Sequence, residues 1–248
     1  MTIPGGERWG GSRRPGASER VLELARGGEL GPFDWLARSV SSSATRVLDL
    51  ACATGVMTRR LVSDGRTVIG VDLSSDNIAE AGSTGIGEYV QADMRFLPFA
   101  DGSFDAVVSS LGLGMVDDRD EFLAEVSRVL RPGGIFAALT PSLRPLGRSD
   151  LRIIGQLAAH LRVAPQVPGL AEFRAKQSLA AVGLTKIEDK RARYHFTIAG
   201  PHDAEVLLAG LREATDRARA AAAEFLADRA ARGEFTIPLP TRRIVALK

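Results

Sequence analysis

Short apolar segments recur between residues 46 and 140, and stretches with helical periodicity separate them. The apolar segments cover residues 46–50, 67–72, 88–91, 106–110 and 135–140. Continuous apolar runs of this length are typical of strands that are buried on both faces. Their alternation with helices predicts an α/β fold, in which helices cover both faces of a parallel sheet.

The segments around these strands carry signals for the starts and ends of helices. We predict helices over residues 55–63, from the N-cap residue Ser74 onward, and over residues 118–130. Ahead of the first strand, Ser18 is expected to cap a helix over residues 19–26, because serine favours N-cap positions.

The second half of the chain is less regular. Helical patterns cover residues 149–162, 170–182 and 203–232. A strand is expected over residues 186–196. Proline cannot donate a hydrogen bond to a sheet, so the last strand is expected to begin after Pro238 and Pro240 and to cover residues 242–247.

The pattern predicts one domain with two appended features. Residues 1–17 are rich in glycine, proline and arginine and are expected to be mobile, while residues 18–248 form a single domain. Residues 141–169 follow the fifth strand and are a candidate lid insertion over a ligand site. Two interpretations of the helix over residues 149–162 stay open: an apolar lid, or a helix that simply packs on the sheet.

Composition and charge favour an ordinary globular protein without a nucleic-acid partner. Of the 248 residues, 45% are apolar and 25% are charged, and the formal net charge is only +2. A nucleic-acid surface needs clustered basic residues. The basic clusters at residues 12–14, 190–193 and 241–243 are short and have acids nearby, so we interpret them as solvated surface.

Cysteine, histidine and hydropathy patterns exclude several further classes of site. Cys52 is the single cysteine and is expected to fill space in its loop, and the three histidines lack the spacing of metal ligands, so we predict neither a disulfide nor a metal site. No segment approaches the roughly 18 to 20 apolar residues of a membrane span, and the N-terminus lacks a signal core. We therefore expect a cytoplasmic protein.

Acidic residues stand at or just after the ends of three successive predicted strands. They are Asp49 in the first, Asp72 at the end of the second and Asp93 after the third. Ligands of open parallel sheets bind outside the carboxyl ends of the strands. Asp72 can accept hydrogen bonds from both hydroxyls of a ribose. Asp93 can accept one from an adenine amino group, with Met94 against the base, and together these residues predict an adenosine site.

The loop after the first strand, ACATG over residues 51–55, begins like a nucleotide-binding strand-loop-helix. A dinucleotide loop needs glycines so that its backbone can approach the phosphates. Alanine is tolerated at positions 51 and 53 if φ stays negative there, whereas a positive φ costs roughly 1–2 kcal/mol. Asp49 and the backbone carbonyls attract an ammonium group, so the loop suits a ligand with an ammonium group better than one with phosphates.

Four segments resemble the class I S-adenosylmethionine-dependent methyltransferases in order and spacing: VLDLACATG, VIGVDLS, QADMRFLPFADGSFDAVVSS and FLAEVSRVLRPGG. Within this family the chain is most similar to the small-molecule branch that includes quinone-biosynthesis-type enzymes. The resemblance covers residues 45–140 well and residues 170–248 more loosely. It implies a Rossmann-like, doubly wound α/β fold with a mostly parallel seven-stranded sheet. The last strand is antiparallel and inserted between the fifth and the sixth.

The resemblance also implies where S-adenosylmethionine binds. It places the methionine part along Asp49 and along the loop residues Ala51, Cys52, Ala53, Thr54 and Gly55. It places the ribose on Asp72 with Leu73 against the adenine, the adenine edge on Asp93 and Met94, and Ser109 near the sulfonium.

The chain departs from the family pattern at three places. The family usually has glycine at position 53 and often at position 51, where this chain has alanine. Many relatives carry a histidine pair after the fourth strand, where this chain has Gly114-Met115. The early aromatic-acid signature of the family is absent, and Trp9 is its only substitute.

Two functional hypotheses follow from the resemblance and the departures. The first is methyl transfer to a small molecule such as a polyketide, a quinone or another apolar acceptor. The alternative is an adenosyl-binding module without catalysis that serves in regulation or assembly. A nicotinamide dehydrogenase is disfavoured by Asp49 and by the absence of G-x-G-x-x-G. Methyl transfer needs a general base only for some acceptors, so His160, His195 and Tyr194 stay unassigned candidates, and the oligomeric state stays open.

Overall fold

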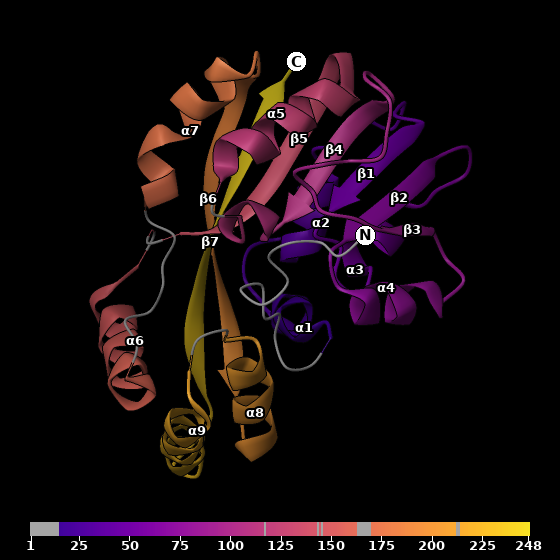
Figure 1. The fold of residues 1–248 in the computed structure, drawn as a ribbon. Coiled ribbons are helices and arrows are strands. Elements are labelled where there is room, and N and C mark those ends of the chain that lie inside the picture. The colour runs from indigo at the N-terminus through magenta and orange to yellow at the C-terminus, as the bar shows by residue number, and fades with distance from the viewer. Residues whose placement is uncertain (1–14, 117, 143, 145, 163–169, 212–213) are drawn as a thin grey trace.

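A seven-stranded sheet forms the centre of the molecule (Figure 1). Its strands are β1 (Arg46–Leu50), β2 (Thr67–Asp72), β3 (Glu88–Gln91), β4 (Phe104–Ser110), β5 (Leu130–Pro141), β6 (Thr185–Ile198) and β7 (Phe235–Leu247). They are arranged in the order β3-β2-β1-β4-β5-β7-β6. β7 is antiparallel to both of its neighbours, and the other pairs are parallel. The fold class implied by the resemblance is therefore confirmed.

The computed structural model describes residues 15–116, 118–142, 144, 146–162, 170–211 and 214–248. Residues 1–14 of the predicted mobile segment lie outside the described residues. So do residues 143, 145 and 163–169 of the predicted insertion. In the described part of the chain, no helix is long and apolar enough to cross a membrane.

Helices cover both faces of the sheet and one end of the molecule. The α-helices are α1 (Ala17–Leu24), α2 (Pro32–Ala37), α3 (Val56–Leu61), α4 (Ser75–Gly82), α5 (Arg119–Val129), α6 (Arg148–Leu161), α7 (Leu170–Ala181), α8 (Pro201–Ala209) and α9 (Asp216–Ala230), and a short 3₁₀ helix covers Gly112–Gly114. Ser74 caps α4 as predicted, with its side chain accepting from the Asn77 N–H. The predicted cap Ser18 is wrong: α1 begins at Ala17, two residues before the predicted start, with Gly16 as its N-cap, and the Ser18 hydroxyl donates to the Gly210 carbonyl instead.

The helical stretch over residues 203–232 forms two helices. Gly210 ends α8, and the Thr215 side chain caps α9 by accepting from the Ala218 N–H. A cap residue followed by an alanine-rich run starts a new helix readily.

The two faces of the sheet bury separate apolar cores. On one face, Leu48 and Leu50 of β1 belong to the same buried cluster as Phe122 of α5. On the other face, Val47 of β1 belongs to a cluster that includes Met57 of α3. Side chains alternate between faces along a strand, so Asp49 lies on the same face as Val47, under α3.

A third apolar core lies beyond the sheet, around the far ends of β6 and β7. These two strands stay paired out to Ile198 and Phe235, whereas the pairing of β5 with β7 ends at Pro141 and Thr241. Figure 1 shows this part of the hairpin running away from the sheet, with α6, α8 and α9 around it. The buried cluster includes residues of α6, α8, α9 and both strands, among them Leu157, Phe196, Leu207, Leu226 and Ile237. The helix predicted over residues 149–162 therefore packs in this outer core.

The predicted start of the last strand is wrong, because β7 already begins at Phe235 and includes both prolines. Pro238 and Pro240 pair with His195 and Arg193 of β6. The Pro240 carbonyl accepts from the Ser142 N–H, so the polar backbone groups of Pro240 face away from β6. At an edge position the ladder needs no N–H from these residues, and proline is tolerated there.

Candidate functional site

The loop between β1 and α3, residues 51–55, is a tight turn with three left-handed residues. Ala51, Ala53 and Gly55 have φ angles of 56°, 45° and 83°. The condition that φ stays negative is therefore met at neither alanine, and each carries a strain of roughly 1–2 kcal/mol. Gly55 cannot be replaced as easily, since a Cβ there would lie 2.4 Å from the Tyr89 hydroxyl oxygen.

Backbone hydrogen bonds and burial hold this loop against the sheet. The Cys52 N–H donates to the Val71 carbonyl of β2 at 3.0 Å, and the Gly55 N–H donates to the Cys52 carbonyl at 2.8 Å. The Cys52 thiol is buried, and burial raises its pKa far above the ordinary value. An inert thiol that fills space agrees with the role expected for Cys52.

Asp49 lies beneath the loop, fully buried, with one carboxylate oxygen unsatisfied. Its Oδ2 accepts from the Thr58 hydroxyl of α3 at 2.7 Å, while its Oδ1 has no hydrogen-bond partner in the described structure. Burial raises the pKa of Asp49 from 3.8 to about 8. The Thr58 hydrogen bond opposes this shift, and the charges of Glu19 and Asp72 add to it. Asp49 is therefore mostly protonated near neutral pH.

Asp72 connects the end of β2 to the loop. Its Oδ2 accepts from the Ala53 N–H at 2.9 Å. Its Oδ1 accepts from the Ser74 N–H at 2.9 Å and from the Asn77 amide at 3.1 Å. An ionised carboxylate can accept about four hydrogen bonds. The carboxylate thus retains a free acceptor position, and binding both hydroxyls of a ribose requires one of these donors to move.

Glu19 of α1 is a site residue that the sequence analysis missed. Its Oε2 accepts from the Thr54 N–H at 2.7 Å and from the Thr54 hydroxyl at 2.6 Å, and its Oε1 accepts from the Val56 N–H at 3.2 Å. Burial raises the pKa of Glu19 from 4.5 to about 7, against these hydrogen bonds and the charge of Arg59. One signal was available: Glu19 lies three residues before the buried Leu22, on the apolar face of its helix.

The predicted adenine-binding residues are partly engaged with protein groups. Arg95 donates to both carboxylate oxygens of Asp93, at 2.6 Å from Nη2 to Oδ2 and 3.1 Å from Nε to Oδ1. Burial opposes ionisation of Asp93, but the hydrogen bonds and charge of Arg95 outweigh it and lower the pKa of Asp93. Met94 packs against the α5 side of the core, and the Leu73 carbonyl accepts from the Gln91 amide at 3.1 Å. The structure thus turns the Asp93 carboxylate toward arginine.

Ser109 occupies the end of β4 beside β1. It pairs in register with Leu50, and its buried hydroxyl donates to the Leu50 carbonyl at 3.0 Å. The fold therefore gathers Asp49, Asp72, Ser109 and the loop at the carboxyl ends of β1, β2 and β4, and Asp93 follows β3.

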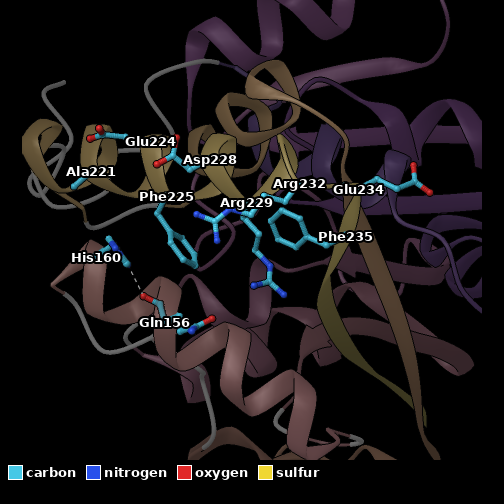
Figure 2. Close-up of a pocket in the computed structure, with 11 residues that line it drawn as sticks. Gln156, His160, Ala221, Glu224, Phe225, Asp228, Arg229, Arg232, Glu234 and Phe235 are labelled. Atoms are coloured by element: carbon cyan, nitrogen blue, oxygen red, sulfur yellow. Dashed lines mark hydrogen bonds between the residues drawn. The ribbon is translucent and has the colours of Figure 1, made fainter.

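His160, one of the three candidate bases, lines a separate cleft. Its ring stacks on Phe225 with centroids 4.3 Å apart, and its Nδ1 lies 2.8 Å from the Gln156 carbonyl oxygen. The cleft has a volume of about 660 Å³. Figure 2 shows it between α6 and α9, with Arg229 near Phe235. None of the predicted cofactor residues lines it. His160 is thus a packing residue of the outer core.

The other two candidate bases, Tyr194 and His195, are consecutive residues of β6. Tyr194 is buried against Trp35, with ring centroids 6.3 Å apart, and burial raises the pKa of Tyr194 to about 12. The backbone of His195 pairs with Arg26 through two hydrogen bonds of 2.7 and 2.8 Å. A tyrosine with this pKa is a poor general base near neutral pH.

The hydrogen-bond acceptors of this site fit an adenosyl ligand that carries an ammonium group. A buried carboxylate oxygen without a partner is rare and costly, and an ammonium group above the loop would supply the donor that Asp49 Oδ1 lacks. Glu19, Asp49 and Asp72 are all acidic, which disfavours phosphates at this loop. Within the described ranges, no three histidine, cysteine, aspartate or glutamate side chains gather as a metal site.

Comparison with known proteins points to one family. A methyltransferase domain family matches residues 48–138. A malonyl-[acyl-carrier protein] O-methyltransferase from Enterobacter lignolyticus is 30% identical over 180 residues, which cover 63% of this chain and 72% of that protein.

Two further similarities agree with this match. A ubiquinone/menaquinone biosynthesis C-methyltransferase from Teredinibacter turnerae is 41% identical over 99 residues, which cover 36% of this chain and only 40% of that protein. The crystal structure of a SAM-dependent methyltransferase from Methanosarcina mazei superimposes with a TM-score of 0.56 at 17% identity, covering 89% of this chain and 99% of that one. At this identity the superposition shows a shared fold.

Proposed function

The chain belongs to the class I S-adenosylmethionine-dependent methyltransferases, and we propose that it transfers a methyl group from S-adenosylmethionine to a small-molecule acceptor. The observation that carries the proposal is the unpartnered Oδ1 of Asp49 beneath the loop that Asp72 holds. Those two carboxylates and the loop carbonyls offer acceptors for one ammonium group and one ribose. A dinucleotide carries no ammonium group that could pair with Asp49.

In this proposal each predicted residue has a role toward the ligand. Asp49 and the carbonyls of residues 51–55 hold the ammonium end, and Asp72 holds the ribose. Leu73 and Met94 lie against the adenine. Asp93 accepts from the adenine amino group once Arg95 yields one of its contacts. Ser109 stands near the reacting end, at the edge where β4 meets β1.

The bound cofactor would supply an electrophilic methyl group on a sulfonium, from which a neutral thioether leaves readily. The residues of the chain then need to orient the acceptor in line with that methyl group and to exclude water. A general base is needed only if the acceptor must lose a proton. The absence of a histidine pair after β4 therefore does not weigh against catalysis.

We assign the acceptor to small apolar molecules. One matched relative is named for ubiquinone and menaquinone biosynthesis, which supports an apolar small-molecule acceptor, and another is named for a malonyl group on an acyl-carrier protein. We place α6 as part of a cap over the acceptor site, because it follows β5 directly and rests on its own core with α9.

A labelled-methyl assay tests this proposal. The purified protein is incubated with methyl-labelled S-adenosylmethionine and a panel of quinols, hydroxylated aromatics and malonyl thioesters. We expect label to appear in at least one acceptor and to be lost in the Asp72→Asn variant, while the exposed Asp76→Asn control retains it. Binding of the cofactor with no transfer to any class of acceptor would instead favour the non-catalytic adenosyl-binding module.

A further inference from the structure

We propose that Glu19 is a positioning residue that holds the β1–α3 loop in its cofactor-binding shape, as a side-chain substitute for the loop glycines that this chain lacks. The inference rests on the proposed function, because it assigns Glu19 to the same site. It concerns a residue of α1, outside the four segments that carry the resemblance, and outside the matched residues 48–138.

The contacts of Glu19 are directed at the loop backbone. Its carboxylate accepts three hydrogen bonds, from the Thr54 N–H, the Thr54 hydroxyl and the Val56 N–H. The Thr54 N–H directly follows Ala53 in the loop, and the Val56 N–H is the first amide of α3, where a helix leaves its amides without internal partners. Glu19 is only 7% exposed, so these hydrogen bonds are shielded from water. One side chain thus fixes the loop at the residues directly after its second left-handed alanine.

The loop needs such support because two of its left-handed residues are alanines. Ala51 and Ala53 both have positive φ, which L-residues with a Cβ disfavour. Strained backbone of this kind persists only where surrounding contacts over-determine it. Asp72 supplies one such contact through the Ala53 N–H, from the sheet side of the loop. Glu19 supplies the contacts from the opposite end.

Helix α1 is itself fixed to the rest of the protein. Val21 lies in the outer core with α8, and Leu22 lies in the core between α2, α3 and the sheet. α1 therefore bridges the outer core and the loop, and Glu19 projects from this bridge. The Gly16 position, just before α1, approaches the loop closely as well: a Cβ there would lie 2.7 Å from the Thr54 hydroxyl oxygen.

Charges around Glu19 make this contact sensitive to protonation. Arg59 of α3 favours the ionised form of Glu19, and the charge of Glu19 in turn raises the pKa of the buried Asp49 of β1. Asp72 adds a further negative charge near Asp49. Only the ionised carboxylate offers all its lone pairs to the three donors.

The first test compares two substitutions on α1. Glu19→Ala removes the contact with the loop, and Glu23→Ala removes a carboxylate that contacts Arg20 on the same helix. We expect Glu19→Ala to weaken S-adenosylhomocysteine binding by about tenfold or more in calorimetry, and Glu23→Ala to leave it unchanged. Glu19→Gln, which keeps the shape and one acceptor oxygen, should fall between wild type and Glu19→Ala. It also serves if Glu19→Ala does not fold.

The second readout needs no ligand. Cys52 is the only cysteine of the chain and is buried within the loop, so its rate of alkylation by iodoacetamide reports loop opening. We expect Glu19→Ala to speed this alkylation by about tenfold, since a thiol reacts when it becomes exposed and ionised. This readout keeps the inference testable even if wild-type protein binds no S-adenosylhomocysteine, a result that would overturn only the proposed function.

A rescue experiment separates positioning from a general loss of structure. Glycine adopts positive φ without strain. Adding Ala51→Gly and Ala53→Gly to Glu19→Ala therefore removes the backbone strain against which Glu19 is proposed to hold the loop. We expect the triple variant to regain affinity and slow alkylation to within about threefold of wild type. The inference is overturned if Glu19→Ala binds the ligand as well as or better than wild type, or if the glycines restore neither readout.

Discussion

The backbone N–H of Ala53 donates a hydrogen bond of 2.9 Å to the side chain of Asp72, which ties the loop after β1 to the end of β2. The two residues are 19 positions apart in sequence. The carboxylate expected to hold a ribose is thus also part of the scaffold of the loop. Substitution of Asp72 should therefore affect the ligand and the loop together.

Asp72→Asn should weaken S-adenosylhomocysteine binding by about 10- to 100-fold, because hydrogen bonds to a charged acceptor contribute about 1.5–3 kcal/mol. The matched control is Asp76→Asn, an exposed carboxylate in the first turn of α4. Calorimetric titration of both variants checks the prediction. Equal affinities of the two variants for S-adenosylhomocysteine would show that Asp72 does not contribute to binding.

Ala51→Gly and Ala53→Gly should each stabilise the folded protein by up to about 1 kcal/mol. Relief of left-handed strain contributes roughly 1–2 kcal/mol, and the added chain entropy of glycine costs roughly 0.5–1 kcal/mol. Ala79→Gly, at an exposed position in α4, is the control and should lose about 1 kcal/mol. Urea unfolding measures all three, and a loss of stability in the loop variants equal to that in the control would contradict the strain.

The free energy of unfolding should fall as pH rises from about 5 to 8. Asp49 and Glu19 have folded pKa values of about 8 and about 7, above their ordinary values of 3.8 and 4.5. The folded state therefore binds more protons than the unfolded state in this window, so the free energy of unfolding falls as pH rises; the contribution of Glu19 ends near pH 7 and that of Asp49 near pH 8. Other carboxyl groups have a lowered pKa in the folded state, such as Asp189, which accepts hydrogen bonds from Arg242. These groups stop stabilising the folded protein only at lower pH.

Asp49→Asn should reduce this dependence between pH 5 and 8, because the amide does not titrate and only the contribution of Glu19 remains. Thermal unfolding followed across that range in wild type and variant measures the difference. A wild-type melting temperature that climbs steadily from pH 5 to 8 would show that these two carboxyls are not held protonated.

Ligand binding should release protons from Asp49. An ammonium group placed at its unpartnered oxygen favours the ionised form and lowers the pKa. At pH 7 we expect a release of up to about one proton, given the pKa of about 8 without ligand. Calorimetry of S-adenosylhomocysteine binding in two buffers of different ionisation enthalpy gives the number. The same release in Asp49→Asn would assign the proton to another group.

The sequence predicts the inner part of the fold well, because local pattern determines it. The strands β1, β2 and β3 have the predicted bounds, since short apolar runs between turn signals leave little choice. Pro238 and Pro240 led to a wrong start for β7, because edge and centre positions look alike in a sequence. The outer core was not predicted either, since helical periodicity shows that a helix has an apolar face but not what covers it.

The sequence likewise predicts only part of the candidate site. Asp49, Asp72 and the loop follow from strand ends and spacing, whereas Glu19 reaches Thr54 across 35 positions of sequence and only the tertiary fold brings them together. The positive φ angles of Ala51 and Ala53 could not be read from alanine, which normally avoids them. The pairing of Asp93 with Arg95 was open to prediction, since the two are close in sequence.

The most direct test of the account is a calorimetric titration of the folded wild-type protein with S-adenosylmethionine, S-adenosylhomocysteine and NAD. The account predicts saturable binding of both sulfur ligands with one site per chain, and no detectable binding of NAD. Binding of NAD in preference to the sulfur ligands, or no binding of any of the three, would contradict the adenosyl site at the β1–α3 loop.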